Sequence, residues 1–346
     1  MTGSAWTARL FRLAAAVAGV AAACAGAAEE AGGGPPDKQA KLRAELGKLP
    51  LRVVYESYGD GNWELRAMRA DGTGGVNLTR TPDVHELLPH ASPDGRRISF
   101  LVDAGTGRDK VRSAYVMNAD GSERKRVAAN ARQPCWGPRG RRLLYARSEY
   151  KRFTHSSYAT KELVFYDVAA GTHTPHANNK LLHVTYLCWS PGGRWIFGTV
   201  HGGMGFGHAN VAIEADGTGV ASVRRIGGCR IDVRRDGRKV LWNASDQAIV
   251  AADLDVNSRP PKVGTIRTIV SCPRTHMVYH GDWSPDGRYV LFAHGPTGQQ
   301  HAGLKAPGWH ICVADAAETN VWVRLTSDGQ SNKEPDWLVP ANPEGK

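Results

Sequence analysis

The stretch Asp282–Gly295, DWSPDGRYVLFAHG, decides the fold class of this sequence. It predicts a strand ending at Trp283, a tight turn over residues 284–287, and a second strand over residues 289–292, whose side chains are nearly all strand formers. In the turn, proline pre-sets φ, aspartate can accept hydrogen bonds from backbone amides just ahead, and glycine supplies a positive φ. The stretch is therefore interpreted as a β-hairpin.

This hairpin recurs along the chain. Two copies are weaker: the fourth, at Val233, has lost tryptophan and proline, and the last keeps the strand without the turn. The positions equivalent to Trp283, called here the repeat tryptophan positions, are Ala91, Trp136, Trp189, Val233, Trp283 and Trp337. They stand 44 to 54 residues apart. A period of this size indicates a propeller or a solenoid.

Between the hairpins the chain places further strand pairs that end at Asp-Gly turns, at residues 65–72, 114–121 and 211–217. Each repeat therefore contains four short strands, and four-stranded antiparallel sheets repeated around an axis are propeller blades. The sequence predicts an all-β, six-bladed β-propeller. Its ring is expected to close by pairing of an N-terminal strand, residues 52–58, with a C-terminal strand, residues 334–339.

These residues resemble a known family. The pattern Trp-Ser-Pro-Asp-Gly-Arg, a hydrophobic strand, then Asp-Gly and Leu-Thr at Leu78-Thr79 and Leu325-Thr326 is similar to the TolB-type propeller repeat of exported bacterial proteins. The resemblance covers roughly residues 51–339 and implies the fold. TolB also has an α/β domain before its propeller, which the short segment before residue 51 cannot encode. We therefore expect a TolB-like propeller rather than TolB itself.

The segment before the propeller predicts export. Residues 1–28 carry two arginines, an uncharged run and small residues, which together are typical of a signal peptide. Cys24 follows alanines and is a candidate lipid-anchor position, with ordinary cleavage after Ala27 as the alternative. Residues 29–50 are interpreted as a linker and a short packing helix over Asp37–Leu49, residues 51–340 as the propeller, and residues 341–346 as a tail. No transmembrane segment is expected. The predicted location is periplasmic or secreted, and the alternative is an outer-membrane lipoprotein.

The net charge and the cysteine content limit which classes of partner and which cysteine chemistry are expected. The formal net charge of +11 becomes +9 once Arg9 and Arg12 leave with the signal peptide. A basic exported protein attracts anionic lipid, anionic glycans or acidic proteins, whereas nucleic acid is not expected there. Of the remaining cysteines, Cys135 and Cys188 precede repeat tryptophans and are interpreted as small buried hydrophobes. A disulfide bridge between Cys229 and Cys272 is an alternative that the sequence does not decide.

The candidate binding site follows from propeller geometry. The residue three before each repeat tryptophan position should lie at one mouth of the central channel. These residues are Leu88, Gln133, Tyr186, Arg230, His280 and Glu334. Loops carrying His201 and His294 should return to the same face. The predicted ligand-binding residues are Gln133, Tyr186, His201, Arg230, His280, His294 and Glu334.

Two interpretations of this mouth stay open. In the first, it binds a protein segment or an anionic glycan. In the second, His201, His280 and His294 hold Mn, Zn or Fe, since imidazole suits these metals. His280 resembles a ligand position of oligogalacturonate lyases, manganese-dependent propellers, which implies a metal-dependent lyase or hydrolase of acidic polysaccharide. Their His-x-His pair is absent here, because Val278 stands two before His280.

Several enzyme classes are disfavoured. The chain has no Gly-x-Ser-x-Gly elbow of a serine peptidase. Residues 85–90 miss the HExxH spacing by one residue and contain Pro89, which would break the required helix. Residues 202–207 are glycine-rich, but they do not open a helix as a phosphate-binding loop does. A binding or scaffold module is therefore the expected function, with the metal-dependent enzyme as the alternative.

Overall fold

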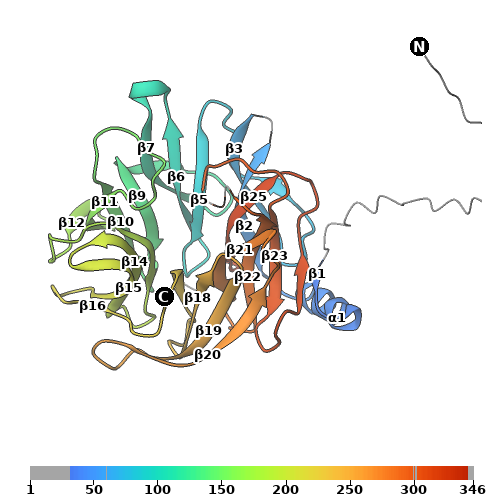
Figure 1. Ribbon diagram of the computed structural model, residues 1–346. Coiled ribbons are helices and arrows are strands. Elements are labelled where there is room, and N and C mark those ends of the chain that lie inside the picture. Colours follow the sequence, from blue (N-terminus) through green and yellow to red (C-terminus); the bar gives the residue numbers. More distant parts are fainter. Residues whose placement is uncertain (1–31, 60, 299, 301, 342–346) are drawn as a thin grey trace, which may run out of the picture. The chain divides into compact units, whose positions relative to one another are not determined.

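A computed structural model describes residues 32–341 except 60, 299 and 301. The predicted signal peptide, Cys24 and most of the tail lie outside the described residues. The described chain forms six antiparallel sheets arranged around an axis (Figure 1). Within this part of the chain, no helix is long and apolar enough to cross a bilayer.

The blades are given with their strands from the axis outward. Blade 1 contains β25 (Ser331–Leu338), β2 (Arg52–Gly59), β3 (Asn62–Arg69) and β4 (Val76–Asn77). Blade 2 contains β5 (His85–Ala91), β6 (Arg97–Ala104), β7 (Val111–Asn118) and β8 (Lys125–Ala129). Blade 3 contains β9 (Ala131–Trp136), β10 (Arg142–Ser148), β11 (Thr160–Asp167) and β12 (Thr172–Pro175).

The second half of the ring follows the same order. Blade 4 contains β13 (Val184–Trp189), β14 (Trp195–Gly203), β15 (Phe206–Glu214) and β16 (Val220–Ser222). Blade 5 contains β17 (Cys229–Val233), β18 (Lys239–Ser245), β19 (Ala248–Asp255) and β20 (Lys262–Ser271). Blade 6 contains β21 (His276–Trp283), β22 (Tyr289–Pro296), β23 (His310–Asp315) and β24 (Trp322–Arg324), to whose edge β1 (Gly32–Gly33) adds a fifth strand.

The repeat turn forms as the sequence predicts. In the turn after Trp283, the Ser284 hydroxyl donates to Asp286 Oδ1 at 2.6 Å and accepts from the Tyr289 amide at 2.9 Å. The amide of Gly287, whose φ is 69°, donates to the Ser284 carbonyl at 2.8 Å. The turn beginning at Ser92 repeats these contacts. The hydrogen bonds that fix these hairpin turns therefore all lie within the turns themselves.

The Leu-Thr motif also has a structural explanation. The Thr79 hydroxyl accepts a hydrogen bond from the Leu65 amide at 2.9 Å, and the Thr326 hydroxyl accepts one from the Ile311 amide at 3.0 Å. In both blades the threonine thus binds the third strand just after the fourth strand ends.

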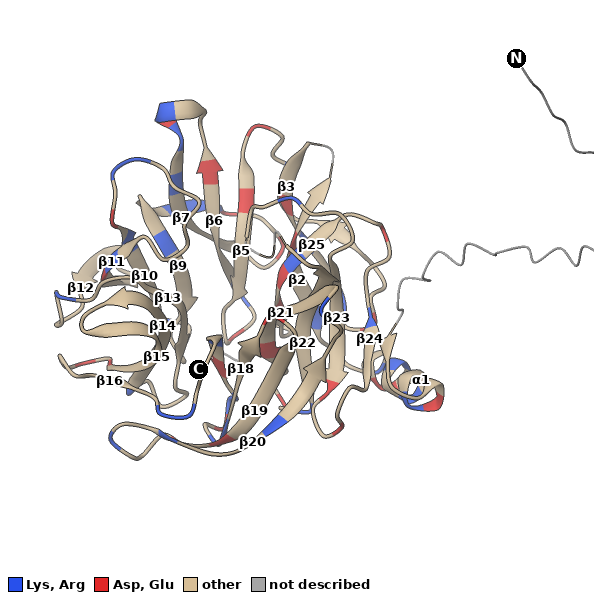
Figure 2. Ribbon diagram, viewed as in Figure 1, with Lys and Arg blue, Asp and Glu red and all other residues tan. Residues whose placement is uncertain are grey.

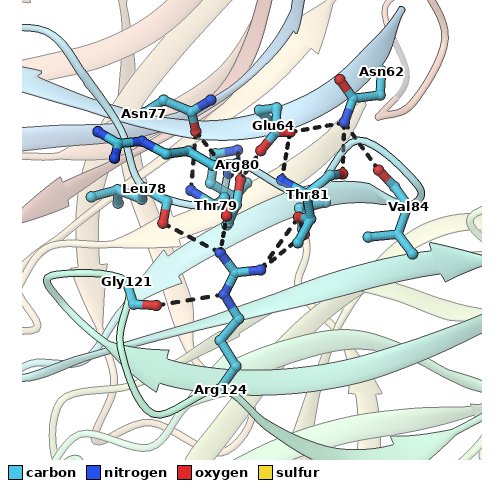
Figure 3. Close-up of polar contacts among 12 residues, drawn as sticks. Asn62, Glu64, Asn77, Leu78, Thr79, Arg80, Thr81, Val84, Gly121 and Arg124 are labelled. Atoms are coloured by element: carbon cyan, nitrogen blue, oxygen red, sulfur yellow. Dashed lines mark hydrogen bonds and ion pairs between the residues drawn. The ribbon is translucent and has the colours of Figure 1, made fainter.

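A polar cluster beside Thr79 joins blades 1 and 2 (Figure 3). The guanidinium of Arg124 donates to the carbonyls of Leu78 and Thr79 and lies 3.4 Å from a carboxylate oxygen of Glu86. Glu64 in turn accepts from the Asn62 amide group at 2.9 Å. Hydrogen bonds of charged groups therefore reinforce apolar packing at this blade junction.

The short helix packs as expected, although it ends earlier. Helix α1 spans Pro36–Leu46 rather than reaching Leu49, because the chain leaves the helix at Gly47, whose amide donates to the Arg43 carbonyl. Leu42 and Leu46 are buried in one apolar cluster with residues of blades 1 and 6. Glu45 accepts hydrogen bonds from the Tyr289 hydroxyl at 2.9 Å and the Arg288 guanidinium at 2.7 Å.

Ring closure occurs as predicted. Strands β2 and β25 pair antiparallel, with Arg52 opposite Leu338 and Tyr58 opposite Ser331. Figure 1 shows the blue β2 and the red β25 within one blade. The C-terminal strand is therefore the innermost strand of a blade that N-terminal strands complete.

We expect removal of residues 334–346 to abolish cooperative unfolding, because blade 1 would lose the strand at the axis. Thermal unfolding followed by circular dichroism and by calorimetry tests this expectation. A truncated chain that melts in one sharp transition would contradict closure by β25.

Replacement of Trp283 by alanine should cost roughly 3–5 kcal/mol of unfolding free energy, as for other buried aromatic residues. The residue is 5 % exposed and belongs to one apolar cluster with Leu241 of blade 5 and Phe292 of blade 6. Urea unfolding measures the loss, and a change below about 1 kcal/mol, the size of an ordinary substitution, would refute this packing role.

Candidate axial binding site

The inner strands of all six blades line one cavity along the axis, with a volume of about 510 Å³. Side chains from three successive levels of these strands face it. The first level contains the predicted mouth residues Leu88, Gln133, Tyr186, Arg230, His280 and Glu334. The second contains His90, Cys135, Cys188, Asp232, Asp282 and Asp336, called here the middle ring. The third lies at the hairpin turns and contains Pro93, Pro138, Pro191, Arg235 and Pro285.

The first-level residues share an unusual backbone conformation. Their φ values lie between 47° and 61°, a left-handed region that residues other than glycine rarely adopt. The pairing of each inner strand with its neighbour shifts register at this point. A strained bulge that recurs in every blade is a regular part of the repeat and not a local defect. Backbone strain of this kind is often found at functional sites.

At the first level, one ionic cluster crosses the axis. A guanidinium nitrogen of Arg230 lies 3.1 Å from Glu334 Oε2 and 2.5 Å from His280 Nδ1, and its plane lies over the Tyr186 ring at 4.0 Å. Burial and the nearby guanidinium lower the pKa of His280 to about 4, so its imidazole is neutral at pH 7. His280 Nε2 lies 3.0 Å from the Gln300 carbonyl, and Nδ1 lies close to both an Arg230 nitrogen and Glu334 Oε2, the latter at 2.7 Å. Although burial opposes it, Arg230 holds the pKa of Glu334 well below its usual range.

The structure places this cluster at a covered end of the cavity rather than at an open mouth. Arg230, His280 and Glu334 are only 5 to 7 % exposed. The loop after β22 folds back over the axis, where the Gly303 amide donates to Glu56 Oε1 at 3.2 Å. The first-level residues therefore form the floor of the cavity, and the hairpin turns surround its open end. Five of the predicted ligand-binding residues therefore lie at the axis, but at its covered end instead of the open mouth that the sequence predicts. They are Gln133, Tyr186, Arg230, His280 and Glu334.

The middle ring joins neighbouring blades. Asp232 Oδ2 accepts from the Trp283 amide at 2.9 Å, and Asp282 Oδ2 accepts from the Trp337 amide at 3.3 Å. Asp336 Oδ2 accepts from the Ala91 amide at 3.1 Å. Each of these carboxyl groups therefore binds the backbone of the next blade.

The three carboxyl groups also interact with one another. Burial, followed by the charges of Asp336 and Asp232, raises the pKa of Asp282 well above its usual value. Asp282 therefore keeps its proton to a higher pH than an ordinary aspartate does.

The other members of the ring differ in charge state. Although burial opposes it, the hydrogen bond that His90 Nδ1 donates to Asp336 Oδ2 at 3.1 Å raises the pKa of His90. Burial raises the pKa of the Cys135 and Cys188 thiols, so both stay protonated. Cys188 Sγ donates to Asp232 Oδ1 at 3.4 Å. Both cysteines are half-buried and pack against apolar clusters of their blades, as predicted, and they also face the cavity, which the sequence does not predict.

The remaining histidine and cysteine predictions have different outcomes. His201 lies on β14 against Tyr158, and His294 lies on β22 against Trp322, and neither lines the cavity. Among the described residues, no three His, Cys, Asp or Glu side chains are grouped so as to hold a metal. A metal at the axis therefore stays a prediction. Cys229 is a free thiol, so the bridge to Cys272 is not formed.

Comparison with known proteins establishes the fold. No protein-family model matches this chain, and no curated protein matches it. Among solved structures, TolB from Acinetobacter baumannii superposes with a TM-score of 0.63 at 16 % identity, covering 87 % of this chain and 71 % of that one. The fold is that of the TolB propeller.

Two further structures share the TolB-like fold. A chain of the nidogen/laminin complex gives a TM-score of 0.58 at 8 % identity, covering 84 % of this chain and 98 % of that one. Hydrazine synthase of Kuenenia stuttgartiensis gives 0.60 at 11 % identity, covering 88 % of this chain and 49 % of that one. This chain thus spans about half of the hydrazine synthase chain. At these identities the likeness concerns the fold alone.

The carboxyl cluster predicts a pH-dependent stability. Because the folded pKa of Asp282 is raised, its contribution is fully present below the unfolded value of about 3.9 and is lost as pH rises through the folded value. Asp282→Asn keeps a hydrogen-bond donor without a charge. We expect its stability relative to the wild type to increase from pH 4 to pH 8 in urea unfolding. The exposed Asp216→Asn is the control, and an equal pH trend in both variants would contradict the raised pKa of Asp282.

Proposed function

We propose that this propeller is an exported binding module that takes an extended segment of a protein partner into the open end of its axial cavity. The observation that carries the proposal is the cavity itself, which all six inner strands line. Its volume of about 510 Å³ falls within the usual range of ligand pockets. Export is part of the proposal and rests on the signal-like sequence of residues 1–28.

The lining suits a polypeptide. Four turn prolines form apolar walls at the open end: Pro93, Pro138, Pro191 and Pro285. Deeper inside, Asp232, Asp282 and Asp336 provide hydrogen-bond acceptors for amide groups. Because the ring includes carboxylates, it favours a segment with N–H donors or positive charge. The same carboxylates disfavour the anionic glycan as the ligand of this cavity, although the surface carries many Lys and Arg residues on its loops (Figure 2).

The floor favours binding over catalysis. A lyase acting on acidic sugars would use Arg230 to neutralise a substrate carboxylate, but Glu334 already pairs with this guanidinium. His280 contacts Gln300 through one ring nitrogen and both Arg230 and Glu334 through the other, so both ring nitrogens are engaged. These residues therefore stabilise the floor, and we keep the enzyme only as the alternative. The nidogen/laminin structure is itself a complex of proteins, which agrees with a binding role for this fold.

A random peptide library displayed on phage tests the proposal with the purified protein as target. We expect enrichment of peptides with lysine or arginine at a common position. Cys188→Trp fills the cavity, and Pro191→Trp narrows its open end, so both should abolish binding of the enriched peptides. Thr174→Trp places the same bulk on exposed β12 and is the matched control. Peptides that bind the cavity-filled variants as well as the wild type would overturn the proposal, provided that melting temperatures show that the variants are folded.

A further inference from the structure

Two histidines face each other across the hairpin of β14 and β15. His201 and His208 are direct partners in the antiparallel register, and their ring centroids lie 4.7 Å apart. The side chains of directly opposed residues lie on the same face, with Cβ atoms about 4.5–5.5 Å apart. His208 is exposed, and His201 is half-buried, with its Nε2 shielded from solvent. Neither lines the axial cavity.

The turn of this hairpin fixes the pairing. Residues Met204 and Gly205 have φ values of 53° and 80°, and Gly203 pairs with Phe206 on either side of them. Positive φ at both central positions is typical of the two-residue type I′ turn, whose twist matches that of the strands. Because loop length and turn type set the register of a hairpin, this turn holds His201 opposite His208.

We propose that His201 and His208 form a surface site for a divalent transition-metal ion, of the class of Zn²⁺, Ni²⁺ and Cu²⁺, with water completing the coordination. Neutral imidazole is a preferred ligand of these ions. Histidine nitrogens bind zinc at about 2.0–2.1 Å, so two ligands of one ion lie about 3.3 Å apart. Since the χ2 torsion of histidine is soft, small ring rotations bring one nitrogen of each opposed ring to this spacing.

The surroundings hold the hairpin in place. Tyr158 stacks on His201 with centroids 5.2 Å apart, which holds the ring in place from one side. The neighbouring Gly202 carbonyl lies 2.6 Å from His183 Nδ1, and His183 Nε2 lies 3.0 Å from Glu149 Oε2. The hairpin is thus anchored through His183 to a carboxylate, which holds the strand of His201 in place.

A second cross-strand pair shows why exposure matters. His294 and His310 are also direct partners, on β22 and β23, but they are only 5 % and 2 % exposed. A hydrated ion has no path to these buried rings. The hairpin site is therefore distinct from the axial metal predicted from the sequence, and it is independent of the proposed peptide binding.

Isothermal titration of the purified protein, prepared without an affinity tag, with Ni²⁺ and Cu²⁺ tests the site. We expect one ion per chain, and weaker binding below about pH 6.5, where histidine becomes protonated. His201→Gln and His208→Gln should each lower affinity roughly tenfold or more, because two linked ligands bind far better than one. Electron spin echo modulation of the Cu²⁺ complex should show two imidazoles.

His173→Gln is the matched control. His173 is also exposed on a strand, but its cross-strand partner is Tyr166 instead of a histidine. This variant should bind like the wild type. Absence of binding, a loss confined to one of the two hairpin variants, or an equal loss in the control would each overturn the site. Equal melting temperatures of all variants without metal establish that they are folded.

Discussion

The whole ring depends on the pairing of β2 with β25, because each blade packs mainly against its two neighbours. Without that pairing, the blades would form an open row with unpaired edges at both ends. With it, the inner strands meet around one axis, and the cavity acquires continuous walls. The axial cavity is thus a product of closure, and its lining residues come from strands that lie far apart in the sequence.

The features that the sequence predicts well are local. Serine, proline, aspartate and glycine specify the hairpin turn through contacts within six residues, so six copies were enough to predict the blades and the closing strands. The same repeat correctly grouped Gln133, Tyr186, Arg230, His280 and Glu334, because equivalent positions in equivalent strands point at the axis.

The features that the sequence missed depend on distant contacts. The floor is covered because Gln300 contacts His280 and Gly303 contacts Glu56, which no local pattern encodes. Cys135 and Cys188 were assigned only to the core, although the residue before each repeat tryptophan position faces the axis in every blade. Comparing this position across the repeats, where Asp282 and Asp336 also stand, was the signal available for the middle ring.

The covered floor limits how a partner can enter. Arg230, His280 and Glu334, with buried Glu56 and Lys333, concentrate ionisable groups where their removal from water is costly unless they stay paired. Paired, buried ionisable groups of this kind do not separate easily, so the axial cavity is closed at one end. The polypeptide that we propose as ligand could therefore not pass through the ring. It could enter only with a free chain end or as a bent loop, and it would leave through the same open end.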